Sequence, residues 1–184
     1  MSVKPFALMP PLSFAVFYTG VLIAVAFYPG WNPFDYTLSD LGSHNSPDSA
    51  IIFNAGCWLS GIILALGGIG KAFAEKGLNR IAGIVLTVSG IGLFALGFAT
   101  CDYPEIHDTD TYVIFLSAIA SMAVATISDA RDRDWLVVCT SIAIAVLMLI
   151  LNESFSGAIG ETVLISGAFA WSVIQVYKYH KNED

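Results

Sequence analysis

The sequence predicts an all-α membrane protein: a six-transmembrane-helix bundle with a short amphipathic interfacial helix between the first two spans. Three observations support this fold class. Hydrophobic residues make up 56% of the 184 residues and charged residues only 12%, whereas a soluble domain carries about 25% charged residues. The mean hydropathy is +0.72. Six separate segments each approach the length of about 20 apolar residues that a helix needs to cross a bilayer. We therefore expect residues 1–184 to form a single membrane domain.

The six predicted spans are separated by short connections, except after the first. Their approximate boundaries are 11–28, 50–73, 81–100, 111–127, 135–151 and 157–177. The first span includes Pro11 in its first turn, where an α-helix tolerates proline. In the third span, Gly83, Gly90 and Gly97 recur on one helix face, and small residues at such positions allow neighbouring helices to approach closely.

The longest polar interruption of the chain, residues 28–42, is predicted to form a structured connection. Asn32 followed by Pro33 is typical of a helix N-cap and first turn. Asp35 is placed to complete a capping box, and Gly42 is a natural helix end. The pattern therefore predicts a short helix between Asn32 and Gly42.

This short helix is expected to lie at the membrane surface. Phe34, Leu38 and Leu41 would share one apolar face of it. The opposite face would then hold Ser39 and Asp40 near the boundary between water and lipid.

The distribution of charge predicts the orientation in the membrane. All eight Lys and Arg residues fall on one side of the predicted spans, together with six of the acidic residues. The other nine acidic residues lie on the opposite side, which has no Lys or Arg. Basic residues in short loops favour the cytoplasmic side. We therefore expect a multi-pass protein of the cell membrane with both termini in the cytoplasm. We expect no nucleic-acid partner, and the sequence leaves the oligomeric state open.

The polar side chains that could carry chemistry gather on the predicted outer side. Ser39, Asp40 and His107 are the candidate catalytic residues, because a hydroxyl, a carboxylate and an imidazole can act as nucleophile, orienting group and base. No nucleophile-elbow motif surrounds Ser39. Asp40 is expected at the mouth of the bundle, where an acid is costly without a partner. A local partner such as a helix N-terminus would make its role structural, and both alternatives stay open.

Asp40, Asp102 and His107 are also candidate ligands for a divalent cation such as Zn²⁺. Histidine and carboxylate side chains form zinc sites, and an open coordination position lowers the pKa of a bound water. The short zinc motifs that combine two histidines and a glutamate are absent, so the ligands would have to converge from separate loops. The alternative is that His107 caps the following helix or pairs with Asp102 or Asp108 at the surface.

The remaining outer polar residues suggest contact with lipid head groups. Asn32, Asn54 and Glu153 are the candidates for head-group binding. Two function classes follow, both with membrane lipids as partners. The first is an enzyme, a metal-assisted hydrolase or transferase that acts on lipid or lipid-linked head groups. The second is a non-catalytic protein that binds or moves lipid, or that supports other membrane proteins. A transporter fits less well, because no charged residue lies near the middle of a span.

Several short motifs of the chain form a recognisable set. They are Tyr28-Pro29-Gly30, Leu38-Ser39-Asp40-Leu41-Gly42, Phe53-Asn54, Gly97-Phe98-Ala99-Thr100-Cys101-Asp102, and His107 at the start of the fourth span. This set resembles the domain of unknown function 998 (DUF998) family of six-span integral membrane proteins over nearly the whole chain. The resemblance implies the six-helix fold and a distant, fold-level relation to membrane proteins that handle lipids, and it brings no established activity. The recurring polar positions that it implies are Ser39, Asp40, Asn54, Asp102 and His107. His44 and Glu153 lie outside the pattern.

Overall fold

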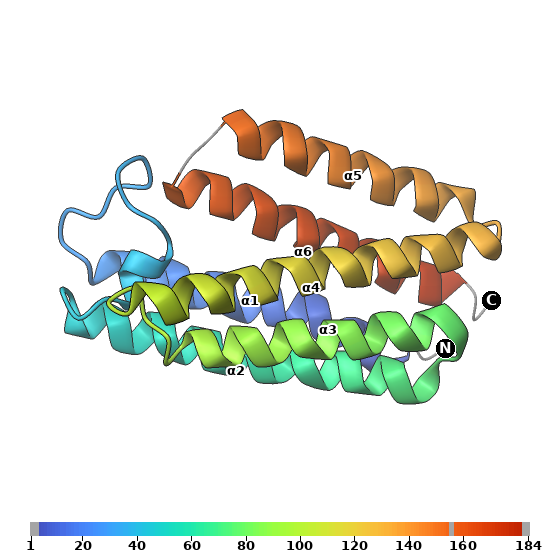
Figure 1. Cartoon of the computed structure of the whole chain (residues 1–184), viewed down its shortest axis with the longest axis horizontal. Coiled ribbons are helices and arrows are strands. Elements are labelled where there is room, and N and C mark those ends of the chain that lie inside the picture. Colours follow the sequence, from blue (N-terminus) through green and yellow to red (C-terminus); the bar gives the residue numbers. More distant parts are fainter. Residues whose placement is uncertain (1–3, 155–156, 182–184) are drawn as a thin grey trace.

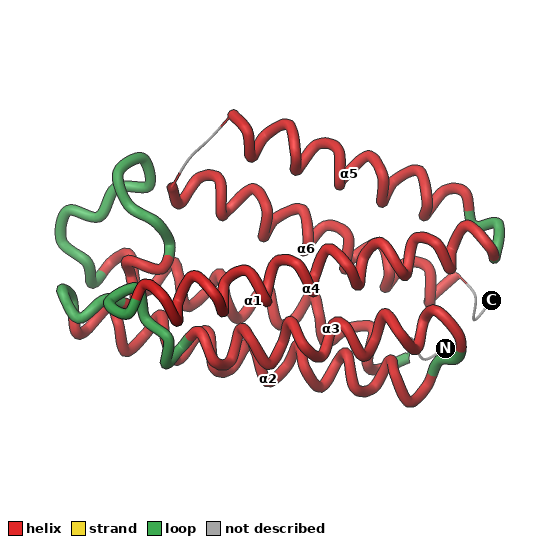
Figure 2. Tube along the Cα trace, viewed as in Figure 1, coloured by secondary structure: helices red, strands yellow, loops and turns green. Residues whose placement is uncertain are grey.

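The structure, a computed structural model, describes residues 4–154 and 157–181, although not the side chains of residues 152 and 153. This part of the chain forms six α-helices and one short 3-10 helix, and it contains no strand. Figures 1 and 2 show the helices side by side in one elongated bundle. The helices are α1 (Pro5–Ala26), η1 (Ser39–Gly42), α2 (Pro47–Ala74), α3 (Gly77–Leu96), α4 (Pro104–Arg131), α5 (Trp135–Ser154) and α6 (Gly157–Lys181).

The length and composition of the helices confirm the predicted all-α membrane fold class. Within the described residues, α1, α2, α3, α4 and α6 are each long and apolar enough to cross a membrane, and α5 adds a shorter apolar stretch, Trp135–Leu151. Large apolar side chains such as Leu22, Ile51 and Leu149 are exposed on the outside of the bundle. Such a surface suits lipid and is too apolar for water.

The two ends of the bundle differ in the connections that they carry (Figure 1). The start of α1, the end of α6 and the α2–α3 and α4–α5 connections lie at one end, called here the terminal end. The α1–α2 and α3–α4 connections lie at the other, called here the loop end. All eight basic residues belong to the terminal end: Lys4, Lys71, Lys76, Arg80, Arg131, Arg133, Lys178 and Lys181.

Several helices extend beyond the predicted apolar spans. Three of them begin at a proline, Pro5, Pro47 and Pro104, because the missing N–H of proline costs nothing at the first helical position. As a result α1 starts before the predicted first span, and Pro10 and Pro11 lie inside it. The first turns of α2 and α4 are polar and lie outside the apolar runs, whereas the predicted start of α1 was placed too late, at Pro11.

The connection between α1 and α2 differs most from the prediction. A short helix does lie between the first two spans, but it is η1, so the predicted start at Asn32 is wrong. The predicted apolar face is wrong as well: Phe34 is 74% exposed, whereas Leu38 and Leu41 are buried against the bundle. The physical reason is local, because the Asn32 Oδ1 atom accepts the Phe34 N–H (3.1 Å) in a tight turn instead of capping a longer helix.

The helices pack unevenly. α1 packs closely on α2, α2 on α3 and α3 on α4, whereas α4 and α5 touch much less. α2 and α3 are especially close because glycine replaces a side chain at their contact. A Cβ atom on Gly61 would lie 2.7 Å from the Phe94 Cα, and one on Gly90 would lie 2.7 Å from the Ala65 Cα. By contrast, α4 and α6 make almost no direct backbone contact. This loose side of the bundle leaves room for a cavity.

Candidate functional site

Asp40 is held by the turn in which it lies. Its Oδ2 atom accepts the Thr37 backbone N–H at 2.6 Å and the Thr37 hydroxyl at 2.9 Å. The Cys101 Sγ atom lies 3.9 Å from the Oδ1 atom. Of the two alternatives for Asp40, a local structural partner is therefore the one that the structure contains. The carboxylate organises the turn that leads into η1.

Ser39 is also engaged locally. Its hydroxyl lies 2.9 Å from the Thr37 hydroxyl, and its carbonyl oxygen accepts the Cys101 thiol at 3.5 Å. Burial, followed by the negative charges of Asp40 and Asp102, raises the pKa of the Cys101 thiol to about 11. This thiol is therefore protonated at neutral pH, and neither Ser39 nor Cys101 is paired with an imidazole base.

Asp102 joins the two long connections of the loop end. Its carboxylate accepts the Ser43 hydroxyl (3.0 Å), the His44 backbone N–H (3.0 Å) and the Thr100 hydroxyl (2.9 Å), and it pairs with the His44 ring at 2.9 Å. Burial alone would raise the pKa of Asp102, but these hydrogen bonds together outweigh it and hold that pKa below its usual value. Asp102 thus stabilises the contact between the α1–α2 and α3–α4 connections.

His107 is buried in the first turn of α4. Its Nδ1 atom lies 2.8 Å from the carbonyl oxygen of Ala99, so the ring ties the start of α4 to the end of α3. This backbone partner differs from the carboxylates proposed for it from the sequence. Asp110 and Glu161 lie within electrostatic range of the ring.

The predicted metal ligands do not form a group. Within residues 4–154 and 157–181, no set of three or more His, Cys, Asp or Glu side chains is close enough together to hold a metal ion. Asp102 already has four hydrogen-bonded or ionic contacts, and His107 uses Nδ1 for Ala99. The role of Asp40, Asp102 and His107 as ligands of a cation such as zinc stays a prediction.

The three predicted head-group residues do not converge either. Asn32 donates from Nδ2 to the Asp35 carboxylate at 2.6 Å, and Asn54 donates weakly to the Gly42 carbonyl oxygen at 3.4 Å. The side chain of Glu153 lies outside the described residues. Glu161, by contrast, accepts the Leu38 backbone N–H at 2.7 Å and so fixes the α1–α2 connection to α6.

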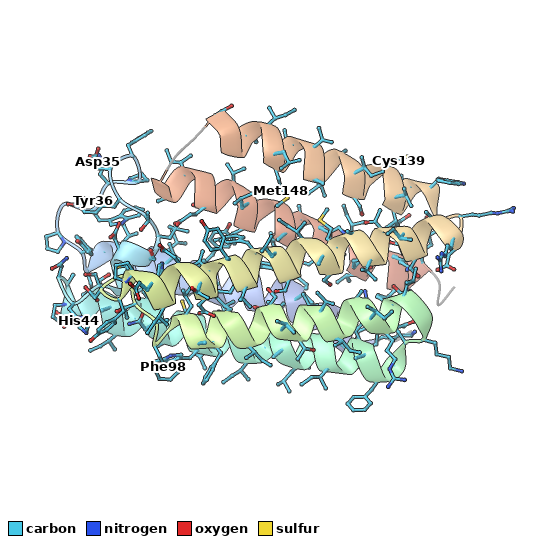
Figure 3. The ribbon with its side chains drawn as sticks, in the orientation of Figure 1. Asp35, Tyr36, His44, Phe98, Cys139 and Met148 are labelled. Carbon is cyan, nitrogen blue, oxygen red and sulfur yellow. The ribbon has the colours of Figure 1, made fainter. Side chains whose placement is uncertain are left out.

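Hydrogen bonds between the connections and the helices therefore hold the loop end together. The Ala158 N–H donates to the Tyr36 carbonyl oxygen at 2.8 Å and adds a second link between α6 and the α1–α2 connection. Figure 3 shows Asp35, Tyr36 and His44 together at this end of the bundle. Most of the polar groups predicted as a site serve here to hold loops in place.

A cavity of about 120 Å³ lies inside the bundle, where α4 and α6 diverge. Its lining comes from all six α-helices and is almost entirely apolar, with Phe14, Leu93, Phe115, Ala118 and Ala168 among the contributors. Sequence reasoning missed this cavity, because no local pattern reports the distance between two helices that are far apart in the chain.

The cavity reaches the outer surface of the bundle. Ile119 of α4 lines it and is also half exposed. Met148 of α5, which Figure 3 shows between α5 and α6, lines both this cavity and a groove of about 490 Å³ between those two helices. Met148 packs directly against Gly167 of α6, where a larger residue would displace it.

The terminal end contains a second set of buried polar residues. Asp129 of α4 is completely buried. Its carboxylate accepts one hydrogen bond from Lys178 of α6 and a second one, at 3.2 Å, from Gln175. Lys71 of α2 is buried beside them. The sequence did contain a signal for this group: Trp171, Gln175 and Lys178 recur on one face of an otherwise apolar helix.

The comparisons with known proteins agree with the fold. No curated protein and no solved structure matches the chain. A family described as "Protein of unknown function (DUF998)" matches residues 11–177, from the first long helix to the end of the sixth. This match confirms the resemblance carried by the short motifs, and the chain belongs to the DUF998 family.

Proposed function

We propose that this protein binds a membrane lipid by its hydrocarbon chain. The observation that supports the proposal is the apolar cavity between α4 and α6, which reaches the lipid-facing surface at Ile119. An apolar cavity does not hold water well but accepts apolar guests. The surrounding bilayer supplies hydrocarbon chains at very high concentration.

The dimensions of the cavity suit one lipid chain. Along α4 its lining runs from Thr111 to Met122, a length of about 16 Å at 1.5 Å per residue. One leaflet of a bilayer has a hydrocarbon thickness of about 15 Å, half of the full core. In length, a single chain therefore matches the cavity. Because a volume of about 120 Å³ is smaller than that of a long alkyl chain, flexible lining side chains such as Met148 must move to admit it.

A route of entry supports the same proposal. The groove between α5 and α6 is open to the surroundings, and Met148 lines both this groove and the inner cavity. Methionine is unbranched and has three rotatable bonds, so it adapts its shape more easily than other apolar residues. A chain can enter when the Met148 side chain swings away from Gly167.

The non-catalytic alternative is favoured over the enzyme. Ser39 and Asp40 are both hydrogen-bonded to Thr37, and no hydrogen bond between described residues joins Ser39 to His107. A hydrolase or transferase role for these three residues stays a prediction. We further propose that the terminal end faces the cytoplasm, because it contains all eight basic residues.

A pair of matched variants on α4 tests the proposal. Ala118 lines the cavity, whereas Ala120 is exposed on the outside of the same helix. Ala118→Phe fills the cavity and should lower the affinity for a radiolabelled lipid chain about tenfold, which corresponds to ~1.4 kcal/mol. Ala120→Phe should leave the affinity unchanged.

The measurement is binding of radiolabelled hexadecanol to the purified protein in detergent, with thermal unfolding of each variant as the check on folding. Equal affinity of the Ala118→Phe variant and the unmodified protein would contradict the proposal. So would equal losses in both variants, since Ala120 does not touch the cavity.

A further inference from the structure

A small polar cavity adjoins the terminal end of the apolar cavity. Its volume is about 20 Å³, and its lining shares Pro10, Leu86, Trp171 and Ser172 with the larger cavity. The two are therefore neighbouring compartments of one space. A guest that fills the apolar compartment reaches the polar one with its end.

Three buried polar groups around the small cavity have no hydrogen-bond partner within the described part of the chain. They are the Trp171 Nε1, Gln175 Oε1 and Tyr179 hydroxyl atoms. Each side chain is more than nine-tenths buried. A buried polar group without a partner destabilises a fold. The Trp171 indole and the Tyr179 hydroxyl are both donors, so this cavity suits a guest that accepts hydrogen bonds.

The charges around this cavity do not balance. The ammonium groups of Lys4, Lys178 and Lys71 lie 5.2, 5.7 and 5.9 Å from the centre of the Tyr179 ring. Lys4 pairs with Glu75 at 2.7 Å, and Lys178 pairs with Asp129.

Lys71 is the third cation of this group and lines the small cavity. Only 6% of the residue is exposed, and no described carboxylate lies within ion-pair distance of its ammonium group. A buried charge without a counter-ion is strongly unfavourable. Among the residues that the structure describes, the cluster is therefore short of one negative charge, next to Lys71.

We infer that the bound lipid is a single-chain anionic amphiphile of the fatty-acid class, with its carboxylate against Lys71. The inference rests on the proposed function and deepens it. The hydrocarbon chain occupies the apolar cavity and runs from Trp171 toward the loop end. The carboxylate accepts hydrogen bonds from the Lys71 ammonium group, the Trp171 indole and the Tyr179 hydroxyl.

The small volume of the polar cavity favours a fatty-acid carboxylate over a larger head group. About 20 Å³ is little more than the 10–15 Å³ that one water molecule needs. A terminal carboxylate can reach into such a space from the apolar side. A glycerophosphate head group is too large for it.

The test compares two probes that share a chain and differ in charge. Radiolabelled palmitate and hexadecanol are titrated into the purified full-length protein and its Lys71→Met variant. The variant should bind palmitate at least about tenfold more weakly, a loss of ~1.4 kcal/mol, and bind hexadecanol as before. Lys76→Met, which removes an exposed lysine close by in the chain, is the control and should bind both probes normally.

A second variant tests the same site in case the Lys71→Met variant does not fold. Tyr179→Phe keeps the aromatic ring and removes only the hydroxyl of a residue that lines the small cavity but not the apolar one, so it should weaken the binding of palmitate and spare that of hexadecanol. Acetate, a carboxylate without a chain, should not displace palmitate at millimolar concentration.

The outcomes separate the two proposals. Equal losses for palmitate and hexadecanol in the Lys71→Met variant would overturn the carboxylate site and leave chain binding intact. Displacement by acetate alone would show a site for free anions and would also overturn the lipid assignment. Failure of both probes to bind the unmodified protein would instead refute the proposed function itself.

Discussion

The two ends of the bundle both contain polar side chains away from bulk water, but they satisfy them in opposite ways. At the loop end the carboxylates of Asp40 and Asp102 accept backbone N–H and hydroxyl groups of the connecting loops, among them those of Thr37, Ser43 and Thr100. At the terminal end Asp129 binds Lys178 and Gln175, 49 and 46 residues away.

This difference distinguishes polar groups that stabilise the fold from polar groups that remain available to bind a ligand. Carboxylates whose partners are nearby backbone and hydroxyl groups fix the shape of a loop and have little capacity left for a ligand. A cluster that holds three lysines, two paired carboxylates and three unpartnered polar atoms is incomplete without a guest. The site residues predicted from the sequence lie at the loop end, but the terminal end has the features of a binding site.

The largest expected effect comes from breaking the buried ion pair. Asp129→Asn leaves Lys178 as well as Lys71 without a counter-ion inside the protein, so we expect a loss of about 3–5 kcal/mol in the free energy of unfolding. Denaturant unfolding in detergent, followed by tryptophan fluorescence, measures it. Asp134→Asn removes an exposed pair with Lys181 (3.5 Å) and should cost under about 1 kcal/mol. Similar losses in the two variants would mean that the terminal end is no more than an ordinary charged surface.

A smaller effect is expected at the loop end. Asp102→Asn weakens hydrogen bonds at a partly exposed site and should cost about 1–2 kcal/mol near neutral pH. Because folding lowers the pKa of Asp102, its carboxylate stabilises the fold fully above the unfolded value of about 3.9. This contribution is lost as the pH falls from there through the lower folded pKa.

The pH dependence sharpens the comparison of the two ends. The difference in unfolding free energy between the unmodified protein and the Asp102→Asn variant should shrink as the pH falls below about 5 and vanish in strong acid. Chemical denaturation at a series of pH values measures it. A difference that persisted unchanged at the acid end would show that the variant acts through packing and not through the charge of Asp102.

Local patterns account for what the sequence could predict. Apolar runs predicted the six helices, and the prolines at 47 and 104 explain why α2 and α4 start earlier than their apolar runs do. The same reasoning failed between Asn32 and Gly42, because Asn32 and Asp40 each close a separate tight turn. Capping rules identify residues that can end a turn, but not which of several will do so.

The binding site depends on contacts between distant parts of the chain. Lys71 looked like a loop residue at the end of an apolar run, and it is buried beside Trp171 and Tyr179 only because α2 packs on α1 and α1 packs on α6. The cavity likewise results from the separation of α4 and α6. Neither property is encoded in the spacing of residues within one helix.

The most direct test of the account maps where a fatty acid touches the protein. A palmitate that carries a photoreactive diazirine in its chain is bound to the purified protein, irradiated, and located by peptide mass spectrometry. The account predicts labels on cavity-lining residues such as Phe115 and Ala168, and their loss when unlabelled palmitate competes. Labels confined to outward-facing residues such as Leu22 and Leu149, unaffected by competition, would contradict it.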